Sequence, residues 1–389
     1  MTVENVIELL ELRMKRVISF LPRKRRPYFE ELKRHFTSRG ILLAGPRGSG
    51  KTTFLLSIAE EKNIFYISAD DPIIYTTPFQ DLAQYILIHY DGLIIDEVHY
   101  LKEWSLHIKS LYDSFPNKAI WLSDSSSIIL RKGIADLSRR FVVHNLPLMS
   151  LREYIYFETG KELPKITDPF DKTSLQIVPE ILREIDILKY FKAYKENGTR
   201  PFYQEGNFAE RVKNVLEKSI YVDIPYFVGQ LTENHFGVMK AIVSHLAFSK
   251  VPTINIEAIC RDWAISKQKL YQLLQAMKEI RLITIVQKSP IEKPYSKGSK
   301  IFFADPVIYN VLEAETGTFR EAFVVFSLKN KGTLLAEKDK TKCDLIFNGM
   351  RLEIGGANKK PKQADFVIRD DIDLSVRNVI PMWVLGMGW

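Results

Sequence analysis

Apolar runs alternate with amphipathic stretches between residues 36 and 150. The runs are short and nearly continuous, as in strands buried on both faces, and the stretches between them repeat apolar residues at helical spacing. Because parallel strands are joined by helices that cover both faces of their sheet, this pattern predicts an α/β domain with a parallel sheet. The predicted strands are 40–45, 64–68, 92–96, 119–123 and 141–144.

An amphipathic segment precedes this domain. Apolar residues from Val3 to Val17 recur at helical spacing, which predicts a helix with one face on the domain that follows. Four basic residues, 23–26, then stand before Pro27. Two interpretations of this basic run stay open, a solvated linker and a contact to phosphate groups.

The pattern changes after residue 150. A stretch rich in aromatic residues and helical spacing predicts a helical lid subdomain. Three short helices, the third over 266–280, and strands over 283–286 and 300–303 then follow in the order of a winged helix. One helix and several short strands predict a small α+β module at the end. The predicted parts are 1–35, 36–150, 151–235, 236–312 and 313–389.

Composition limits the classes of protein to consider. With 389 residues, 46% of them hydrophobic, the chain can bury two or three cores. The formal net charge of +8 favours anionic partners such as nucleotides, nucleic acid or acidic protein surfaces. The sequence contains neither a membrane-spanning apolar run nor a secretory signal, so we expect no membrane partner and a cytoplasmic location. Cys260 and Cys343 stand too far apart in sequence to suggest a chelating pair.

A glycine-rich segment follows the first predicted strand. Residues 45–52 match the phosphate-binding loop pattern at every fixed position. Glycines let backbone N–H groups surround the phosphates of ATP, the Lys51 ammonium reaches the β and γ oxygens, and the Thr52 hydroxyl is a ligand for Mg²⁺. A strand before the loop and a helical stretch after it argue against a turn without a ligand. The predicted ATP-binding residues are Gly45, Pro46, Arg47, Gly48, Ser49, Gly50, Lys51, Thr52 and Thr53.

Paired acidic residues end the third predicted strand. We expect Asp96 to hold Mg²⁺ together with Thr52, and Glu97 to polarise the attacking water. A glutamate beside the metal-binding aspartate indicates hydrolysis as well as binding. The alternative is a surface acidic pair at a strand end, and the phosphate-binding loop upstream argues against it.

Two further positions are candidates for catalysis. Ser123 ends the fourth predicted strand, within a Ser-Asp-Ser-Ser segment over 123–126, where a polar side chain can contact the γ-phosphate or hold the water. A plain turn is the alternative. Arg139 and Arg140 follow segment 136–138 and precede the fifth strand. We expect Arg140 to stabilise charge on the transferred phosphoryl group, in its own subunit or a neighbouring one.

Together these segments resemble a widespread prokaryotic family of AAA-type ATPases. The resemblance continues through 146–154, 300–306, 321–324 and 353–356, so it covers nearly the whole chain. It implies an ATPase core with a helical lid, ATP hydrolysis, and a C-terminal half with a winged helix and a restriction-endonuclease-like module of unknown function. The chain departs from the family where Asp124 and Arg139 stand in place of the more usual glycine.

The last module contains an acidic pair of the endonuclease type. Asp344 and Glu353 fit the aspartate and glutamate that hold Mg²⁺ in such nucleases, but Gly355 takes the position of the lysine that assists the attacking water. The lysines within 359–362 would need a folded-back loop to replace it. We therefore expect a degenerate module used for binding or assembly.

Three hypotheses describe the work coupled to ATP hydrolysis. The first is a motor or switch that acts on DNA or other nucleic acid through the third helix of the winged helix, with a protein-docking role of that helix as the alternative. The second is a nucleotide-controlled interaction switch or assembly factor, with a protein partner or further copies of the chain. The third is an ATP-gated nuclease. The candidate DNA-reading residues are Ser266, Lys267, Gln268, Lys269 and Gln272.

Overall fold

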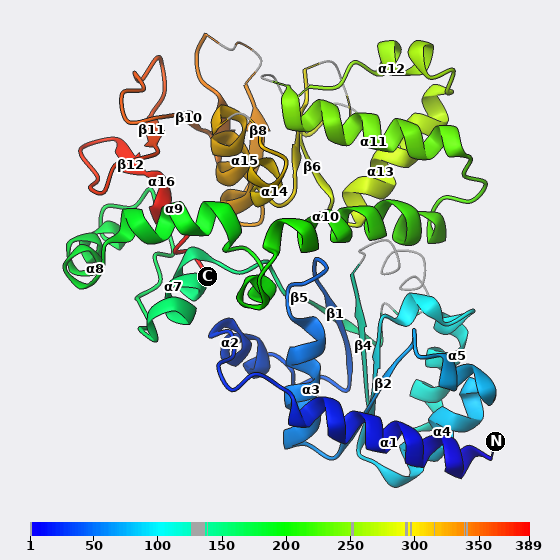
Figure 1. Ribbon diagram of the computed structural model, residues 1–389. Helices are drawn as coiled ribbons and strands as arrows, with labels where there is room; N and C mark the ends of the chain where they lie inside the picture. The colour runs from blue at the N-terminus through cyan, green and yellow to red at the C-terminus, as the bar shows by residue number, and fades with distance from the viewer. Residues whose placement is uncertain are drawn as a thin grey trace. The chain divides into compact units, whose positions relative to one another are not determined.

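The computed structural model describes residues 2–125, 137, 139–249, 253–291, 295, 298–314, 316–337, 339 and 341–389. These residues form two compact units, Met1–Leu148 and Met149–Trp389 (Figure 1). Ser126, Asp136 and Ser138, which belong to segments singled out above, lie outside the described residues. The five-part division expected from the sequence stays a prediction.

A parallel sheet forms the centre of the first unit. Its strands, as far as the described residues go, lie in the order β2-β3-β4-β1-β5. Every residue of β1 and β3 is buried, as expected for central strands with covered faces. The predicted strands agree with the observed ones to within one residue at each end, so the α/β core is confirmed. The strands are β1 Gly40–Ala44, β2 Ile64–Ser68, β3 Gly92–Asp96, β4 Ala119–Asp124 and β5 Val142–Asn145.

Helices flank this sheet (Figure 1). The predicted N-terminal helix is confirmed as α1, which buries Val6, Ile7 and Leu10 and packs against α3, α4 and β2. The phosphate-binding loop joins β1 to α3 and therefore lies at the carboxyl end of the central strands. The helices are α1 Val3–Ser19, α2 Tyr28–Arg34, α3 Lys51–Glu61, α4 Phe79–His89 and α5 Trp104–Ser114, with 3-10 turns η1 Pro72–Thr76 and η2 Val98–Tyr100.

The second unit begins with helices, as the sequence predicts. Ser150 caps α7, and its hydroxyl accepts from the backbone N–H of Glu153 while the Glu153 carboxylate accepts from the backbone N–H of Ser150. Both side chains are fully buried, so the cap fixes the start of this unit. The helices are α7 Leu151–Thr159, α8 Val178–Glu184, α9 Ile187–Asn197 and α10 Phe208–Lys218.

Three helices and a two-stranded antiparallel sheet follow. The structure contains these elements in the predicted order, although the assignment as a winged helix stays a prediction. Ser266 caps the third helix, α13, whose Leu270, Leu273, Leu274 and Met277 are buried. The elements are α11 Glu233–Phe248, α12 Ile256–Asp262, α13 Lys267–Glu279, β6 Ile283–Val286 and β7 Lys300–Phe303.

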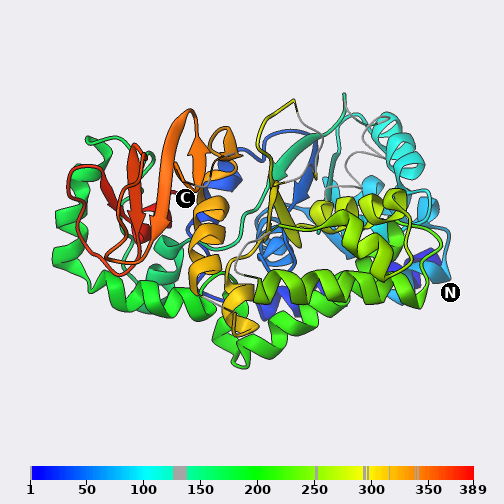
Figure 2. The same ribbon diagram turned by 90° about the horizontal axis from the view of Figure 1, so that it is seen from above.

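A mixed sheet completes the second unit. Its described strands lie in the order β12-β11-β10-β9-β8, antiparallel from β8 to β10 and parallel from β10 to β12. Helix α15 lies against β10 (Figure 2), and α16 packs against β12 and α9. Within the described residues, no helix has the length and apolar character needed to cross a bilayer. The elements are α14 Val307–Val311, α15 Thr316–Leu328, β8 Leu334–Ala336, β9 Leu345–Phe347, β10 Met350–Gly355, β11 Phe366–Arg369, β12 Val379–Pro381 and α16 Met382–Leu385.

Candidate nucleotide-binding site

The phosphate-binding loop needs glycine at three positions for different reasons. Gly48 and Gly50 have φ of 74° and 98°, in the left-handed region that glycine adopts without steric cost. A Cβ on Gly45 would lie 2.5 Å from the carbonyl oxygen of Leu146, so no larger residue fits between β1 and the end of β5. The loop leads directly into α3, whose first backbone N–H groups are available to bind an anion.

Lys51 occupies the first position of α3. Its side chain is 5% exposed, and its ammonium donates to the carbonyl oxygens of Gly45 at 2.9 Å and Pro46 at 3.4 Å. Burial lowers the pKa of Lys51, while the nearby carboxylates of Glu97 and Asp96 act in the opposite direction. The phosphate-binding loop thus holds the Lys51 ammonium against its own carbonyl oxygens.

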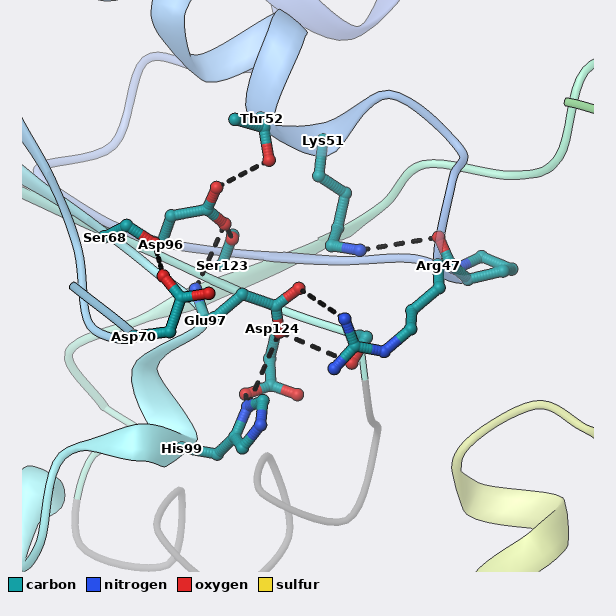
Figure 3. A network of polar contacts seen from close by, with 12 residues as sticks. Arg47, Lys51, Thr52, Ser68, Asp70, Asp96, Glu97, His99, Ser123 and Asp124 are labelled. Carbon is teal, nitrogen blue, oxygen red and sulfur yellow. Dashed lines mark hydrogen bonds and ion pairs between the residues drawn. The ribbon is translucent and has the colours of Figure 1, made fainter. Parts of the chain in front are cut away.

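Asp96 is the centre of a hydrogen-bond network at the end of β3 (Figure 3). Its Oδ2 accepts from the Thr52 hydroxyl at 2.6 Å and from the Tyr66 hydroxyl at 2.9 Å, and its Oδ1 accepts from the Ser123 hydroxyl. Burial, followed by the charge of Asp96, raises the pKa of Tyr66, so this phenol stays a donor. Two predicted site residues, Thr52 and Ser123, therefore meet at the carboxylate of a third, Asp96, and Tyr66 joins them without having been predicted.

Glu97 lies beside this network with an unusual backbone conformation. Its φ of 49° is in the left-handed region, which non-glycine residues adopt at a cost. Arg47 of the phosphate-binding loop lies 3.6 Å from Oε1, and the Ser125 hydroxyl lies 3.5 Å from Oε2. Burial raises the pKa of Glu97, and Lys51 and Arg47 oppose that shift.

His99 and Asp124 extend the network on the far side of Glu97. The Nδ1 atom of His99 lies 2.9 Å from Asp124 Oδ2 and 3.6 Å from Glu97 Oε2. Asp124 is fully buried, and His99 is nearly so. The sequence has no pair of histidines at metal-ligand spacing. Glu97, His99 and Asp124 come close together because the left-handed turn at Glu97 returns the chain toward β4.

Arg140 lies away from the residues just described. Its guanidinium binds Asp113 of α5 through two hydrogen bonds of 2.9 Å and lowers the pKa of that carboxyl group. A Cβ on Gly40, the first residue of β1, would lie 2.3 Å from the Arg140 carbonyl oxygen. Arg140 is therefore at the amino end of β1, whereas the phosphate-binding loop follows its carboxyl end. The structure does not bring this candidate catalytic residue to the loop of its own chain.

Arg26, one of the four basic residues 23–26, contacts the backbone of the phosphate-binding loop. It is 2% exposed, and its Nη1 donates to the carbonyl oxygens of Ser49 at 2.6 Å and Pro147 at 2.8 Å. Its guanidinium carbon lies 5.9 Å from the ring centres of both Tyr28 and Phe29. Neither interpretation of the basic run anticipated this buried role.

We expect Arg26→Met to lower the free energy of unfolding by about 2–4 kcal/mol, because it leaves two carbonyl oxygens without their buried donor. ATP affinity should fall as well, since the loop loses the support behind Ser49. Urea unfolding and nucleotide titration of the full chain measure both effects. Arg23 is exposed, so Arg23→Met, the matched control, should change stability by less than about 0.5 kcal/mol. Equal behaviour of the two variants would contradict the role assigned to Arg26.

The acidic pair of the second unit carries lysines on a folded-back loop. Lys359 Nζ lies 2.8 Å from Glu353 Oε1 and 3.8 Å from Asp344 Oδ2, and Lys362 Nζ lies 2.9 Å from Glu353 Oε1. Glu353 is fully buried. The folded-back loop that would let these lysines take the place of the missing catalytic lysine is thus present. Whether the module cleaves nucleic acid or is degenerate stays a prediction.

Comparison with known proteins finds a domain match over part of the chain. Residues 37–155 match a family model described as an AAA domain. No curated protein matches the chain. The similar solved structures include a Walker-type ATPase of Pyrococcus abyssi (17% identity, 76% of this chain and 99% of that one, TM-score 0.42), the RuvB Holliday junction branch migration motor of Thermotoga maritima (17%, 76% and 92%, 0.30), and a protein with a tetratricopeptide repeat sensor from Pyrococcus horikoshii (15%, 80% and 46%, 0.29).

The AAA-domain match covers the whole sheet from β1 to β5, the phosphate-binding loop and the acidic pair at the end of β3. Family model and geometry therefore lead to one conclusion: the chain contains an AAA-type P-loop ATPase domain and is an ATPase.

Proposed function

We propose that Lys51, Thr52, Asp96 and Glu97 bind and hydrolyse ATP with Mg²⁺. The observation that carries this proposal is the 2.6 Å contact between Thr52 and Asp96, because it joins the phosphate-binding loop to the acidic strand end. Lys51 and the N–H groups of the loop bind the phosphates. Ser123 acts through Asp96, whose orientation it fixes by its hydrogen bond.

The oxygen atoms around Asp96 suit Mg²⁺. This ion prefers hard oxygen ligands, and the Thr52 hydroxyl and Asp96 carboxylate offer two that already lie together. When bound, Mg²⁺ would neutralise charge that develops on the phosphate oxygens of ATP. Thr52 and Asp96 are the residues that would hold it.

Glu97 is the general base of the proposed reaction. It is largely buried beside the loop, and burial raises its pKa, which increases its affinity for the proton of an attacking water. Arg47 contacts one of its oxygens and so connects the base to the phosphate-binding loop. The carboxylate accepts the proton as the water attacks the γ-phosphorus, while the bond from that phosphorus to the bridging oxygen breaks and ADP leaves with the electron pair.

Arg140 fits a role across a subunit boundary. It lies at the amino end of β1, away from the loop of its own chain, so we propose that it stabilises the transferred phosphoryl group in a neighbouring copy. This role requires a homo-oligomer.

We further propose that hydrolysis is coupled to nucleic acid through α13. Gln268 and Gln272 are exposed on this helix, next to Lys267 and Lys269, and the net charge of the chain is +8. The two lysines also have contacts within the unit: Lys267 pairs with Glu257 at 3.2 Å, and Lys269 donates to the Gly229 carbonyl oxygen at 3.0 Å. The glutamines are therefore the better candidates for base contacts.

Added DNA should raise the rate of ATP hydrolysis, with an effect that falls steeply as salt increases. The double variant Gln268→Glu with Gln272→Glu should weaken DNA binding at least tenfold, because a good base contact is worth about 1–3 kcal/mol. Gln176→Glu with Gln204→Glu makes the same charge change at exposed positions of the same unit and serves as the control. Hydrolysis that ignores DNA at every salt concentration would favour the nucleotide-controlled interaction switch.

A further inference from the structure

We infer that His99, held by Asp124, is a positioning residue that orients Glu97 for hydrolysis. The inference rests on the proposed role of Glu97 as the general base, and it gives a use to a buried histidine that the proposed reaction leaves without one.

The backbone brings these three residues together. Glu97 has the left-handed conformation, and η2 follows it at once, so the chain turns back and directs His99 toward the end of β4. Asp124 is the last residue of β4, one strand away from β3 in the sheet. The close-up shows the His99 ring pointing at Asp124, with Glu97 alongside (Figure 3).

The contacts assign different tasks to the two acidic residues. Nδ1 of His99 lies 2.9 Å from Asp124 Oδ2, which is hydrogen-bonding distance, and 3.6 Å from Glu97 Oε2. Asp124 therefore fixes the ring, since an Nδ1–H group has one hydrogen and the shorter contact receives it. Glu97 lies against the ring on one side and against Arg47 at 3.6 Å on the other.

Removal of the imidazole would leave two buried carboxylates facing each other. Like charges at short range repel, and Asp124 already acts to raise the pKa of Glu97. With His99 gone, Glu97 is free to turn away from the phosphate-binding loop. Misplacement of a reacting group by about 1 Å is enough to slow catalysis about a hundredfold.

Two pairs of variants test the inference. His99→Leu removes the donor and keeps an apolar side chain, whereas His99→Asn keeps an N–H donor near the position of Nδ1. Asp124→Leu and Asp124→Asn form the equivalent pair, in which only asparagine keeps an acceptor. We expect both leucine variants to lower kcat at least tenfold with KM for ATP changed less than about threefold, and both asparagine variants to recover most of kcat.

The measurement is steady-state ATP hydrolysis of the full chain, together with ATP titration and thermal unfolding of each variant. If one leucine variant fails to fold, the pair at the other residue decides. A leucine variant with wild-type kcat overturns the inference, as does an asparagine variant no faster than its leucine partner, because shape alone would then explain the histidine. Glu97→Gln runs in parallel: normal hydrolysis by that variant overturns the proposed base itself, whereas an inactive Glu97→Gln beside a normal His99→Leu overturns only the positioning role.

Discussion

Glu97→Gln should bind ATP with the affinity of the wild type and hydrolyse it at least a hundredfold more slowly. General base catalysis contributes about 10²–10⁴ to a rate, and glutamine keeps the size of the side chain while it loses the proton acceptor. The proposed contacts to the phosphates come from Lys51 and the loop, so ATP affinity should be preserved. ATP titration and release of inorganic phosphate from the full chain measure the two quantities separately.

Glu103 provides the matched control for this variant. It is exposed, it also has a φ of 49°, and it precedes α5 outside the network drawn in Figure 3. Glu103→Gln therefore makes the same chemical change at a glutamate with the same backbone conformation, and its hydrolysis should equal that of the wild type. Normal turnover by Glu97→Gln would show that another group accepts the proton.

Lys51→Met should weaken ATP binding and slow ATP hydrolysis. The substitution keeps most of the apolar stem and removes the ammonium that reaches the phosphates. A hydrogen bond to a charged group contributes about 1.5–3 kcal/mol, so ATP affinity should fall roughly ten- to a hundredfold. Hydrolysis should fall further, by an additional factor of about 10²–10³, because charge increases on the phosphate oxygens in the transition state.

The control for Lys51→Met lies just beyond the other end of the same helix. Lys62 is exposed and follows α3, so Lys62→Met removes an equal charge from the helix's surroundings without touching the loop. ATP titration of Lys51→Met and Lys62→Met measures whether the loss of affinity is specific to Lys51. Wild-type affinity in Lys51→Met would mean that nucleotide binds elsewhere in the chain.

Much of the first unit could be predicted because its signals are local. A buried parallel strand is a short apolar run, so the five strands were found to within one residue. The phosphate-binding loop is a contiguous motif with fixed spacing. Asp96 could be placed opposite Thr52 because carboxyl ends of parallel strands share one edge of the sheet, and the two side chains are 2.6 Å apart.

The contacts that could not be predicted from the sequence are buried and join residues that lie far apart along the chain. Arg26 looked like one of four equivalent basic residues, and nothing in that run distinguishes the one whose partners are Ser49 and Pro147. The pairing of His99 with Asp124 depends on the φ of Glu97, two residues before His99, which a local pattern does not reveal. The position of Arg140 could have been predicted. It precedes the parallel strand β5 and therefore lies at the amino ends of the strands, whereas the phosphate-binding loop lies at their carboxyl ends.

The left-handed backbone at Glu97 lowers folding stability at the residue that we propose as the general base. A side chain with a Cβ costs roughly 1–2 kcal/mol in that conformation, and glycine would adopt it freely. Mutational drift without selection for turnover would therefore favour glycine here. Glu103 bears the same cost outside the network, so the contacts of Glu97 with Arg47 and Ser125, and not its backbone angle, separate the proposed base from an ordinary turn residue.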